Sequence, residues 1–211
     1  MGFTASAGSR DLVQEECGVS PLMIGINRYH LDQPFGARWS GGMRHGTQMN
    51  GFLIRIAEPA DLTELYALVR AKAEFDGAVD ALTATEAELG AAIFCEAPQC
   101  DFAVAVQDGV LIGFAAYYPV FSTYAARPGL WMDDLFVEAK ERSRGVGRGL
   151  LQFLAEEAVR RGCCKLEWSL QTSNLRGIAF YEREGAVVRE ENRFAKLDEA
   201  ALVRLIGAGP S

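Results

Sequence analysis

The sequence predicts an α/β (α+β) fold in which helices cover both faces of a mixed, mostly antiparallel, twisted sheet of six to seven strands. Segments that alternate apolar and polar residues, as strands do, are interleaved with segments of helical period. The dipeptide Asp108-Gly109 lies between two alternating segments, which is a strong signal for an antiparallel hairpin. A glycine-rich stretch later separates a strand from a helix. The chain has 211 residues, 49% of them hydrophobic, which suffices for one domain with a full core.

The first half of the predicted domain supplies one strand, two helices and the hairpin. Residues 52–57 (FLIRIA) alternate as a strand. Pro59 suits the first turn of a helix, because its fixed φ and missing N–H cost nothing there. A second helix is expected after Thr83 or Thr85, since either hydroxyl can cap it. Residues 101–118 (DFAVAVQDGVLIGFAAYY) form the two strands of the hairpin.

The second half supplies the glycine loop and the remaining elements. In chain order we expect a strand at 130–137, a helix at about 146–161, a strand at 164–170, a helix at 175–184, closing strands at 186–190 and 193–197, and a last helix at 198–206. Gly185 is the expected stop of the helix at 175–184, because glycine readily adopts the left-handed conformation that ends helices.

Residues 1–48 are expected to be a mobile, largely disordered N-terminal extension, and residues 49–211 the folded domain. The extension holds 8 of the 22 glycines and shows little apolar periodicity. Such a segment lacks the apolar surface that would offset the entropy lost on folding.

Cysteine usage and hydropathy predict a cytoplasmic protein. The five cysteines are odd in number and form no CxxC pair, which favours free thiols over a disulfide framework or a zinc site. No run approaches 18 apolar residues, and no secretory signal is recognisable. We therefore expect no membrane association and no bound metal.

The charge distribution argues against nucleic acid as a partner. The net charge is −7, and residues 51–211 carry all of it, with 17 basic and 24 acidic side chains. An acidic domain repels a polyanion and suits a small cationic substrate better. The alternative is that the charge only keeps the protein soluble.

The stretch at 142–147 (RSRGVG) follows a strand and opens a helix. A helix N-terminus offers unpaired N–H groups and a partial positive charge, and glycines let the backbone approach an anion, usually a phosphate. A Walker loop would require GxxxxGK[ST], and a Rossmann fingerprint would require a third glycine where Leu150 stands, so both nucleotide motifs are excluded. Another phosphate-bearing ligand and a purely structural glycine turn remain as alternatives.

Three stretches together carry a family resemblance. FVEAKERSRGVGRGLLQFL, QTSNLRGIAFYEREGA and RIAEPADLTELYALV, which lie in the family's order across residues 52–206, resemble the GNAT superfamily of acyl-CoA-dependent N-acetyltransferases. AKAEFDG, GFAAYY and RPGLWMDDLFV are similar to the diamine and polyamine acetyltransferases within it. The resemblance implies acetyl-CoA as cosubstrate, direct transfer to a primary amine of a small cationic substrate, and, by analogy, a homodimer.

The resemblance also implies residue roles. Tyr181, in AFY, matches the general acid that protonates the leaving thiolate, although it could instead be a core tyrosine. Asp133 matches a position where these enzymes usually carry Glu, which receives the amine proton, often through water. Its side chain is one methylene shorter, which favours the water relay. Asp134, expected on the opposite face of the strand, is better explained as a structural acceptor.

The binding residues follow from the same matches. The residues expected to hold acetyl-CoA are Leu135, Phe136, Val137, Arg142, Ser143, Arg144, Gly145, Val146, Gly147, Arg148, Asn174, Arg176 and Gly177. Asn174 could equally be a helix N-cap. The residues expected to line the amine pocket are Phe75, Asp76, Tyr124, Asp133, Glu167 and Trp168, whose acidic and aromatic groups suit a cation.

Two alternatives to this function stay open. The first is acetylation of a protein lysine, an N-terminus or an amino acid instead of a polyamine. The second is a non-catalytic acyl-CoA-binding module on the same fold, since a fold does not fix a function. A covalent acetyl-enzyme is not expected, because both histidines precede the domain and none is available to activate Cys163 or Cys164.

Overall fold

The computed structural model describes residues 46–49 and 51–207, and these contain one six-stranded sheet with helices on both of its faces. The strand order is β1-β2-β3-β4-β5-β6. Neighbouring strands are antiparallel except β5 and β6, which are parallel. The predicted mixed, mostly antiparallel sheet is thereby confirmed.

Of the five strand pairings, three join strands that a short turn links: β1 with β2, β3 with β4, and β4 with β5. The strands are β1 (Thr47–Met49), β2 (Phe52–Ile56), β3 (Asp101–Gln107), β4 (Val110–Ser122) and β5 (Arg127–Val137). Each of them pairs with the next in this order. Asp108 and Gly109 join β3 to β4 with φ of 51° and 81°. Positive φ at both positions is what a tight hairpin turn demands, and Asp-Gly tolerates it.

Two helices lie on one face of the sheet. A short 3₁₀ turn, Pro59–Asp61, leads into α1 (Leu62–Phe75), and another, Val79–Ala81, precedes α2 (Glu86–Ile93). Thr85 caps α2: its hydroxyl accepts from the Glu88 N–H, and the Glu88 carboxylate accepts from the Thr85 N–H at 2.8 Å. This reciprocal box satisfies two backbone donors and fixes where α2 begins.

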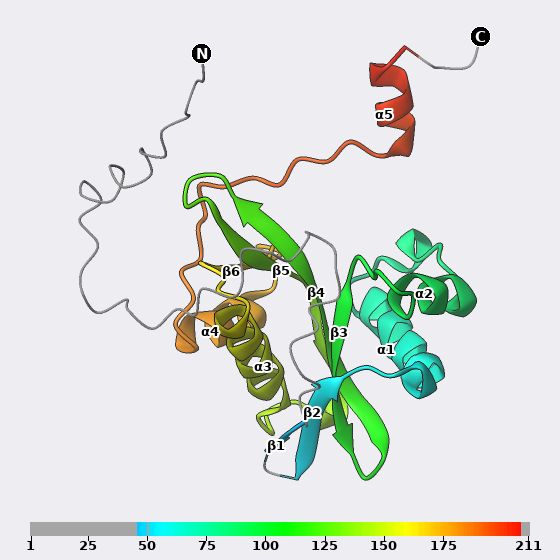
Figure 1. Cartoon of the computed structure of the whole chain (residues 1–211), viewed down its shortest axis with the longest axis vertical. Coiled ribbons are helices and arrows are strands. Elements are labelled where there is room, and N and C mark those ends of the chain that lie inside the picture. Colours follow the sequence, from blue (N-terminus) through cyan, green and yellow to red (C-terminus); the bar gives the residue numbers. More distant parts are fainter. Residues whose placement is uncertain (1–45, 50, 208–211) are drawn as a thin grey trace, which may run out of the picture. The chain divides into compact units, whose positions relative to one another are not determined.

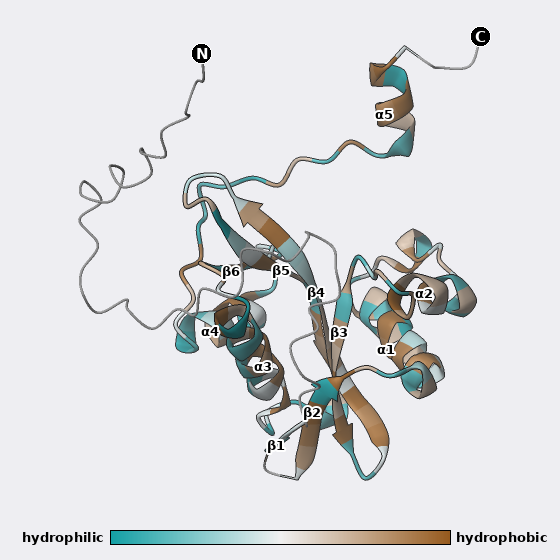
Figure 2. Cartoon of the chain, in the orientation of Figure 1, coloured by the Kyte–Doolittle hydropathy of each residue, from teal (hydrophilic) through white to brown (hydrophobic). Residues whose placement is uncertain are grey.

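The other face carries α3 (Val146–Arg160) and α4 (Leu175–Arg183), as Figure 1 shows. A 3₁₀ turn, Ala139–Glu141, precedes α3, and a last helix, α5 (Glu199–Leu205), begins at its N-cap Asp198. The central strands are largely hydrophobic (Figure 2), because each of their faces is covered.

The sheet separates two hydrophobic cores. Tyr117, Leu130 and Phe153 belong to the core beneath α3, whereas Leu65 and Phe114 belong to the core beneath α1 and α2. All five side chains are almost completely buried. Alternation along β4 and β5 sends successive side chains to the two cores and keeps the strands in register.

Two predictions about the last part of the sheet were wrong. β6 comprises only Leu166–Glu167 instead of 164–170, and neither 186–190 nor 193–197 forms a strand. Val187 and Phe194 are 83% and 76% exposed. Their alternating pattern indicated strands, but a strand also requires a neighbour to pair with, and the described residues provide none there.

β1 begins at Thr47, inside the range assigned to the N-terminal extension. The rest of that prediction, residues 1–45, lies outside the described residues. Within the described ranges, no helix combines the length and the apolar character that crossing a bilayer requires.

Candidate active site

The glycine loop leaves the start of α3 open. Gly145 is the N-cap residue, with φ of 89°, and no side chain caps the helix. Ser143, two residues earlier, has φ of 66°, a conformation that non-glycine residues rarely adopt and that is commonly found at functional sites. The first N–H groups of α3 therefore have no side-chain acceptor and carry the positive end of the helix dipole.

β5 and β6 part close to this loop. They pair only at Leu130 with Leu166 and at Trp131 with Glu167. In the described part of the chain, β5 has no strand partner on that side from Met132 to Val137. Main-chain groups along this edge are consequently available to an extended ligand.

A cavity of about 580 Å³ opens between the parted strands, α3 and α4. Its size falls within the usual range for small-molecule sites. Its lining comprises Phe75, Leu135, Phe136, Val137, Arg142, Ser143, Gly145, Gly147, Arg148, Asn174, Arg176, Gly177, Ala179, Phe180, Tyr181, Arg183 and Glu184. The structure thus brings together eleven of the thirteen residues predicted to hold acetyl-CoA, all except Arg144 and Val146, and adds several from α4 that the sequence did not single out.

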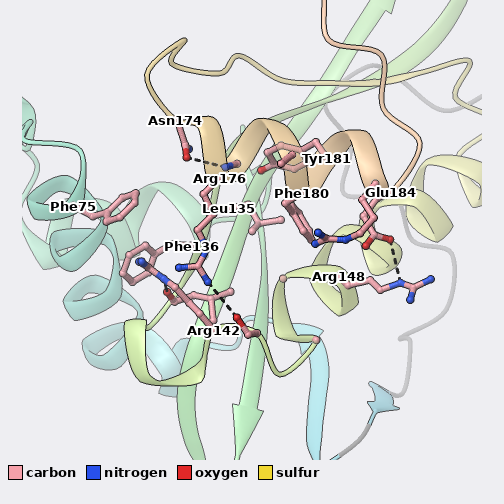
Figure 3. A pocket seen from close by; sticks show the side chains of 17 residues that line it. Phe75, Leu135, Phe136, Arg142, Arg148, Asn174, Arg176, Phe180, Tyr181 and Glu184 are labelled. Carbon is pink, nitrogen blue, oxygen red and sulfur yellow. Dashed lines mark hydrogen bonds and ion pairs between the residues drawn. The ribbon is translucent and has the colours of Figure 1, made fainter.

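The glycine loop carries two arginines, Arg142 and Arg144. The Arg142 Nε donates to the Val137 carbonyl at 2.9 Å, and its Cζ lies 4.6 Å from the centroid of the Phe75 ring (Figure 3). Arg144 forms an ion pair with Glu141 and is not among the lining residues, unlike the prediction. Of the two loop arginines, Arg142 lines the cavity and Arg144 does not.

Two further arginines of the cavity lining, Arg148 and Arg176, bond across to other segments. Arg176 of α4 donates to the Ser143 hydroxyl at 3.3 Å, and Arg148 of α3 pairs with Glu184 at 3.1 Å (Figure 3). Glu184 was not singled out from the sequence; it is the C-cap residue of α4, three positions beyond Tyr181.

Asn174 caps α4. Its side-chain oxygen accepts from the Gly177 N–H at 2.9 Å, and a methyl group on Gly177 would lie 2.6 Å from the Asn174 side chain. Both residues therefore have a local structural role, and both also line the cavity.

Tyr181 lies on α4 and lines the cavity with only 7% of its surface exposed. Its ring packs 4.7 Å from the Trp168 ring, between centroids. Burial, together with the charge of Asp134, raises the pKa of Tyr181 to about 12. The phenol therefore keeps its proton at neutral pH and is a donor to any anion formed beside it.

A β-bulge places Asp133. Ala116 pairs with Asp134 and Tyr117 with Met132, so Asp133 is the extra residue of β5. Asp133 and Asp134 were expected to face apart because strand residues alternate, and the bulge interrupts that alternation at this point. Burial and the Asp134 charge raise the pKa of Asp133, while the Trp131 side chain and Lys72 act in the opposite direction. Neither aspartate lines the cavity described above.

The residues predicted to line the amine pocket are not gathered together. Phe75 forms a wall of the cavity, but Asp76 is paired with Lys72 and Glu167 with Lys165 at 2.7 Å. Tyr124 lies in the turn between β4 and β5, with 104% relative exposure, away from the cavity lining. The sequence did not single out Lys72, which contacts both Asp76 and Asp134.

Among residues 46–49 and 51–207, no group of three or more His, Cys, Asp or Glu side chains is arranged to hold a metal ion.

An open helix N-terminus, a parted sheet edge and a buried phenol around one cavity define a group-transfer enzyme that takes an anionic, extended carrier. The profile of the acetyltransferase (GNAT) family matches residues 46–186, and the chain belongs to that family. It is accordingly an N-acetyltransferase, and enzymes of this family use acetyl-CoA as cosubstrate.

Relatives that share this region are named for amine substrates. An L-ornithine N5-acetyltransferase from Arabidopsis thaliana is 34% identical over 46% of this chain, and the match spans 42% of that protein. A thialysine N-epsilon-acetyltransferase from Sus scrofa is 27% identical over 65% of this chain and 85% of that protein. A human spermidine/spermine N(1)-acetyltransferase-like protein is 26% identical over 69% of this chain and 22% of its own length.

A solved structure supports the fold. An integron cassette protein from the mobile metagenome of V. cholerae superposes with a TM-score of 0.62 at 23% identity, over 75% of this chain and 99% of the other.

Proposed function

We propose that this chain transfers the acetyl group of acetyl-CoA directly to a primary amine of a small cationic substrate of the diamine or polyamine type. The observation that carries the proposal is that the uncapped start of α3, the open edge of β5 and the Tyr181 phenol border one cavity. These suit, in turn, the diphosphate, the extended arm and the leaving sulfur of a thioester carrier.

The diphosphate would bind at the start of α3. The N–H groups of the first helical turn point at an anion there, and Arg142, Arg148 and Arg176 line the same cavity. A methyl group on Gly147 would lie 3.7 Å from its three nearest neighbours, an ordinary contact. Packing within the chain therefore does not require glycine at 147, and the ligand is what needs the space.

The thioester would lie along the edge of β5. Leu135, Phe136 and Val137 border the cavity, and an extended arm with amide groups can bond to the unpaired main chain beside it. A main-chain N–H in this segment would polarise the thioester carbonyl and stabilise the oxyanion of the tetrahedral intermediate.

The acceptor amine must lose a proton before it attacks. A free alkylamine has a pKa of about 10.4, so it arrives as an ammonium ion. Asp133 would receive that proton through a water molecule, since its side chain is one methylene shorter than Glu. Its raised pKa, caused first by burial, strengthens it as a base. Holding both substrates together contributes roughly 7–11 kcal/mol in favourable cases.

The departing sulfur would take the Tyr181 proton. As the new C–N bond forms and the C–S bond breaks, the thiolate becomes basic and accepts a proton from the neighbouring phenol. The pKa of about 12 keeps that phenol protonated beforehand, and solvent restores its proton after turnover.

A covalent acetyl-enzyme is not part of the proposal. Burial is the first cause that raises the pKa of Cys163 to about 11 and that of Cys100 to about 12, so both thiols are weak nucleophiles at neutral pH. None of the cysteines in the described ranges lines the cavity.

One alternative acceptor has specific support. The relatives named for ornithine and thialysine suggest the side-chain amine of a basic amino acid as the acceptor. A non-catalytic acyl-CoA-binding module is favoured only by the shorter carboxylate at Asp133.

A panel of amines tests the function. Release of free thiol from acetyl-CoA would be followed with a diamine, a polyamine, ornithine, thialysine, a lysine-containing peptide and an uncharged amine. We expect the highest kcat/KM with a small cationic amine. Binding of acetyl-CoA without turnover on any acceptor would favour the non-catalytic module, and the highest kcat/KM on the peptide would indicate a protein substrate.

The proposed enzyme acts as a cytoplasmic homodimer, with no nucleic-acid or membrane partner. The resembled polyamine enzymes pair in this way. Sedimentation at micromolar concentration should give twice the mass of the 23.0 kDa chain, and a monomer there would remove the dimer from the proposal.

A further inference from the structure

Lys72 connects α1 to the bulge of β5. Its ammonium lies 2.7 Å from Asp134 Oδ1 and also pairs with Asp76, the residue that ends α1. Only 19% of the Lys72 side chain is exposed. An ammonium ion thus lies between two carboxylates, one from a helix and one from the sheet, directly beside the proposed base.

Lys72 is a fixed cation and not a second base. Burial lowers its pKa, but hydrogen bonds to Asp134 and Asp76 and their charges outweigh that effect and leave the pKa above its ordinary value. The ammonium therefore persists throughout the pH range in which an acetyltransferase would be assayed.

The pairing divides the local carboxylates into two kinds. Asp76 and Asp134 are both held by Lys72. Asp133, the bulge residue, is partly shielded from solvent and makes no ion pair in the part of the chain that the structure describes. If Asp76 or Asp134 moved away from the Lys72 ammonium, that partly buried carboxylate would lose its counterion, which is costly. Asp133 can meet an incoming ammonium ion without breaking such a contact.

We propose that Lys72 is a positioning residue of the acceptor site, whose ammonium holds Asp76 and Asp134 and leaves Asp133 as the single carboxylate presented to the incoming amine. This rests on the proposed acetyl transfer to an amine. If Lys72 neutralises Asp76 and Asp134 in this way, the amine of the substrate meets the charge of Asp133 alone.

The test uses the acidic limb of the pH profile of kcat/KM. Asp133 must be ionised to accept a proton, so activity rises with pH through its pKa. The charged and titratable groups that interact with Asp133 are Lys72, Cys100, Tyr118 and Asp134; Asp76 in turn pairs with Lys72, and Asp101 acts on Cys100. Of these, Lys72 is the cation, and its positive charge lowers the pKa of Asp133. Its removal must therefore move the limb to higher pH.

Three variants separate the possibilities. Lys72→Met removes the charge, Lys72→Arg keeps it, and Arg70→Met removes an exposed cation from the same helix, where it pairs with Glu74 at 3.4 Å. We expect the acidic limb to move up only in Lys72→Met, so that kcat/KM falls relative to wild type at acidic pH, while at pH 7, where Asp133 stays ionised, the two enzymes differ little. Acetyl-CoA affinity, measured by calorimetry, should stay within about twofold in all three. Should Lys72→Met lose its fold, Lys72→Gln removes the charge while keeping two N–H donors.

The outcomes distinguish this proposal from the proposed function. A folded, uncharged variant that binds acetyl-CoA and turns over with an unmoved acidic limb would overturn the role of Lys72 alone. A wild-type protein that releases no thiol with any amine would overturn the acetyl transfer and the acceptor site with it.

Discussion

The two helices that border the cavity begin in opposite ways. α3 starts at Gly145 in a left-handed conformation, with no side-chain cap, whereas α4 starts at Asn174, whose side chain accepts from the Gly177 N–H. A capped helix start has already satisfied one of its backbone donors, while an uncapped one keeps its donors for a ligand. This difference is why we propose that the carrier anion binds at α3, whereas α4 carries Tyr181.

The largest expected effect is on the chemistry that α4 supplies. Tyr181→Phe removes the proton donor without emptying the packing against Trp168, so we expect kcat to fall by roughly 10²–10⁴. Acetyl-CoA affinity should change by less than about threefold. Steady-state kinetics and calorimetry on the same preparation measure both. Turnover at the wild-type rate would remove Tyr181 from the mechanism.

The next effect tests the open end of α3. Gly147→Glu places a carboxylate in the first turn, where it stabilises the helix by about 0.3–1 kcal/mol but repels a diphosphate. We expect acetyl-CoA affinity to fall by about 100-fold, or about 3 kcal/mol, while Tm is unchanged or raised. Gln152→Glu, on the exposed face of the same helix, is the matched control for added charge. Equal affinity in the two variants would show that the anion does not bind at α3.

A smaller effect tests the capped end of α4. Asn174→Ala should cost about 1 kcal/mol of folding free energy and lower Tm by about 2–4 °C, because the Gly177 N–H loses its acceptor. Asn174→Asp, which keeps an acceptor, should restore most of the loss. Thermal unfolding measures the change. A large loss of acetyl-CoA affinity with unchanged Tm would instead make Asn174 primarily a ligand contact.

The smallest expected effect concerns Arg144, the loop arginine that does not line the cavity. Arg144 is paired with Glu141 and half exposed, so Arg144→Ala should change acetyl-CoA affinity by less than about threefold. Arg176→Ala, which removes a cavity-lining arginine that bonds to Ser143, should cost more. Titration of both variants at equal ionic strength gives the ranking, and a larger loss for Arg144→Ala would reverse the assignment of the two side chains.

Features that depend on a few adjacent residues could be predicted from the sequence. The Asp108-Gly109 turn, the Thr85 cap and the glycine loop depend on a few adjacent residues, and all three lie where they were expected. The hexapeptide at 142–147 also indicated an anion site, because helix starts and glycines carry their chemistry locally. Most of the sheet followed from alternation.

What could not be predicted depends on distant partners. The bulge at Asp133 exists only in the register between β4 and β5, and it interrupts the alternation on which the expected opposite orientation of Asp133 and Asp134 depended. The segment at 193–197 alternates like a strand but has no neighbour in the described ranges. Lys72 was missed because its partner Asp134 lies 62 positions along the chain, on another element.

The bulge has a further consequence for how such a site can change. Asp133 belongs to the sheet but does not pair within it, so its replacement disturbs no ladder contact. Asp133→Glu would lengthen the reach of the carboxylate by one methylene while the surrounding strands keep their register. A single substitution at the bulge can therefore change how far the negative charge reaches into the proposed acceptor site without disturbing the sheet.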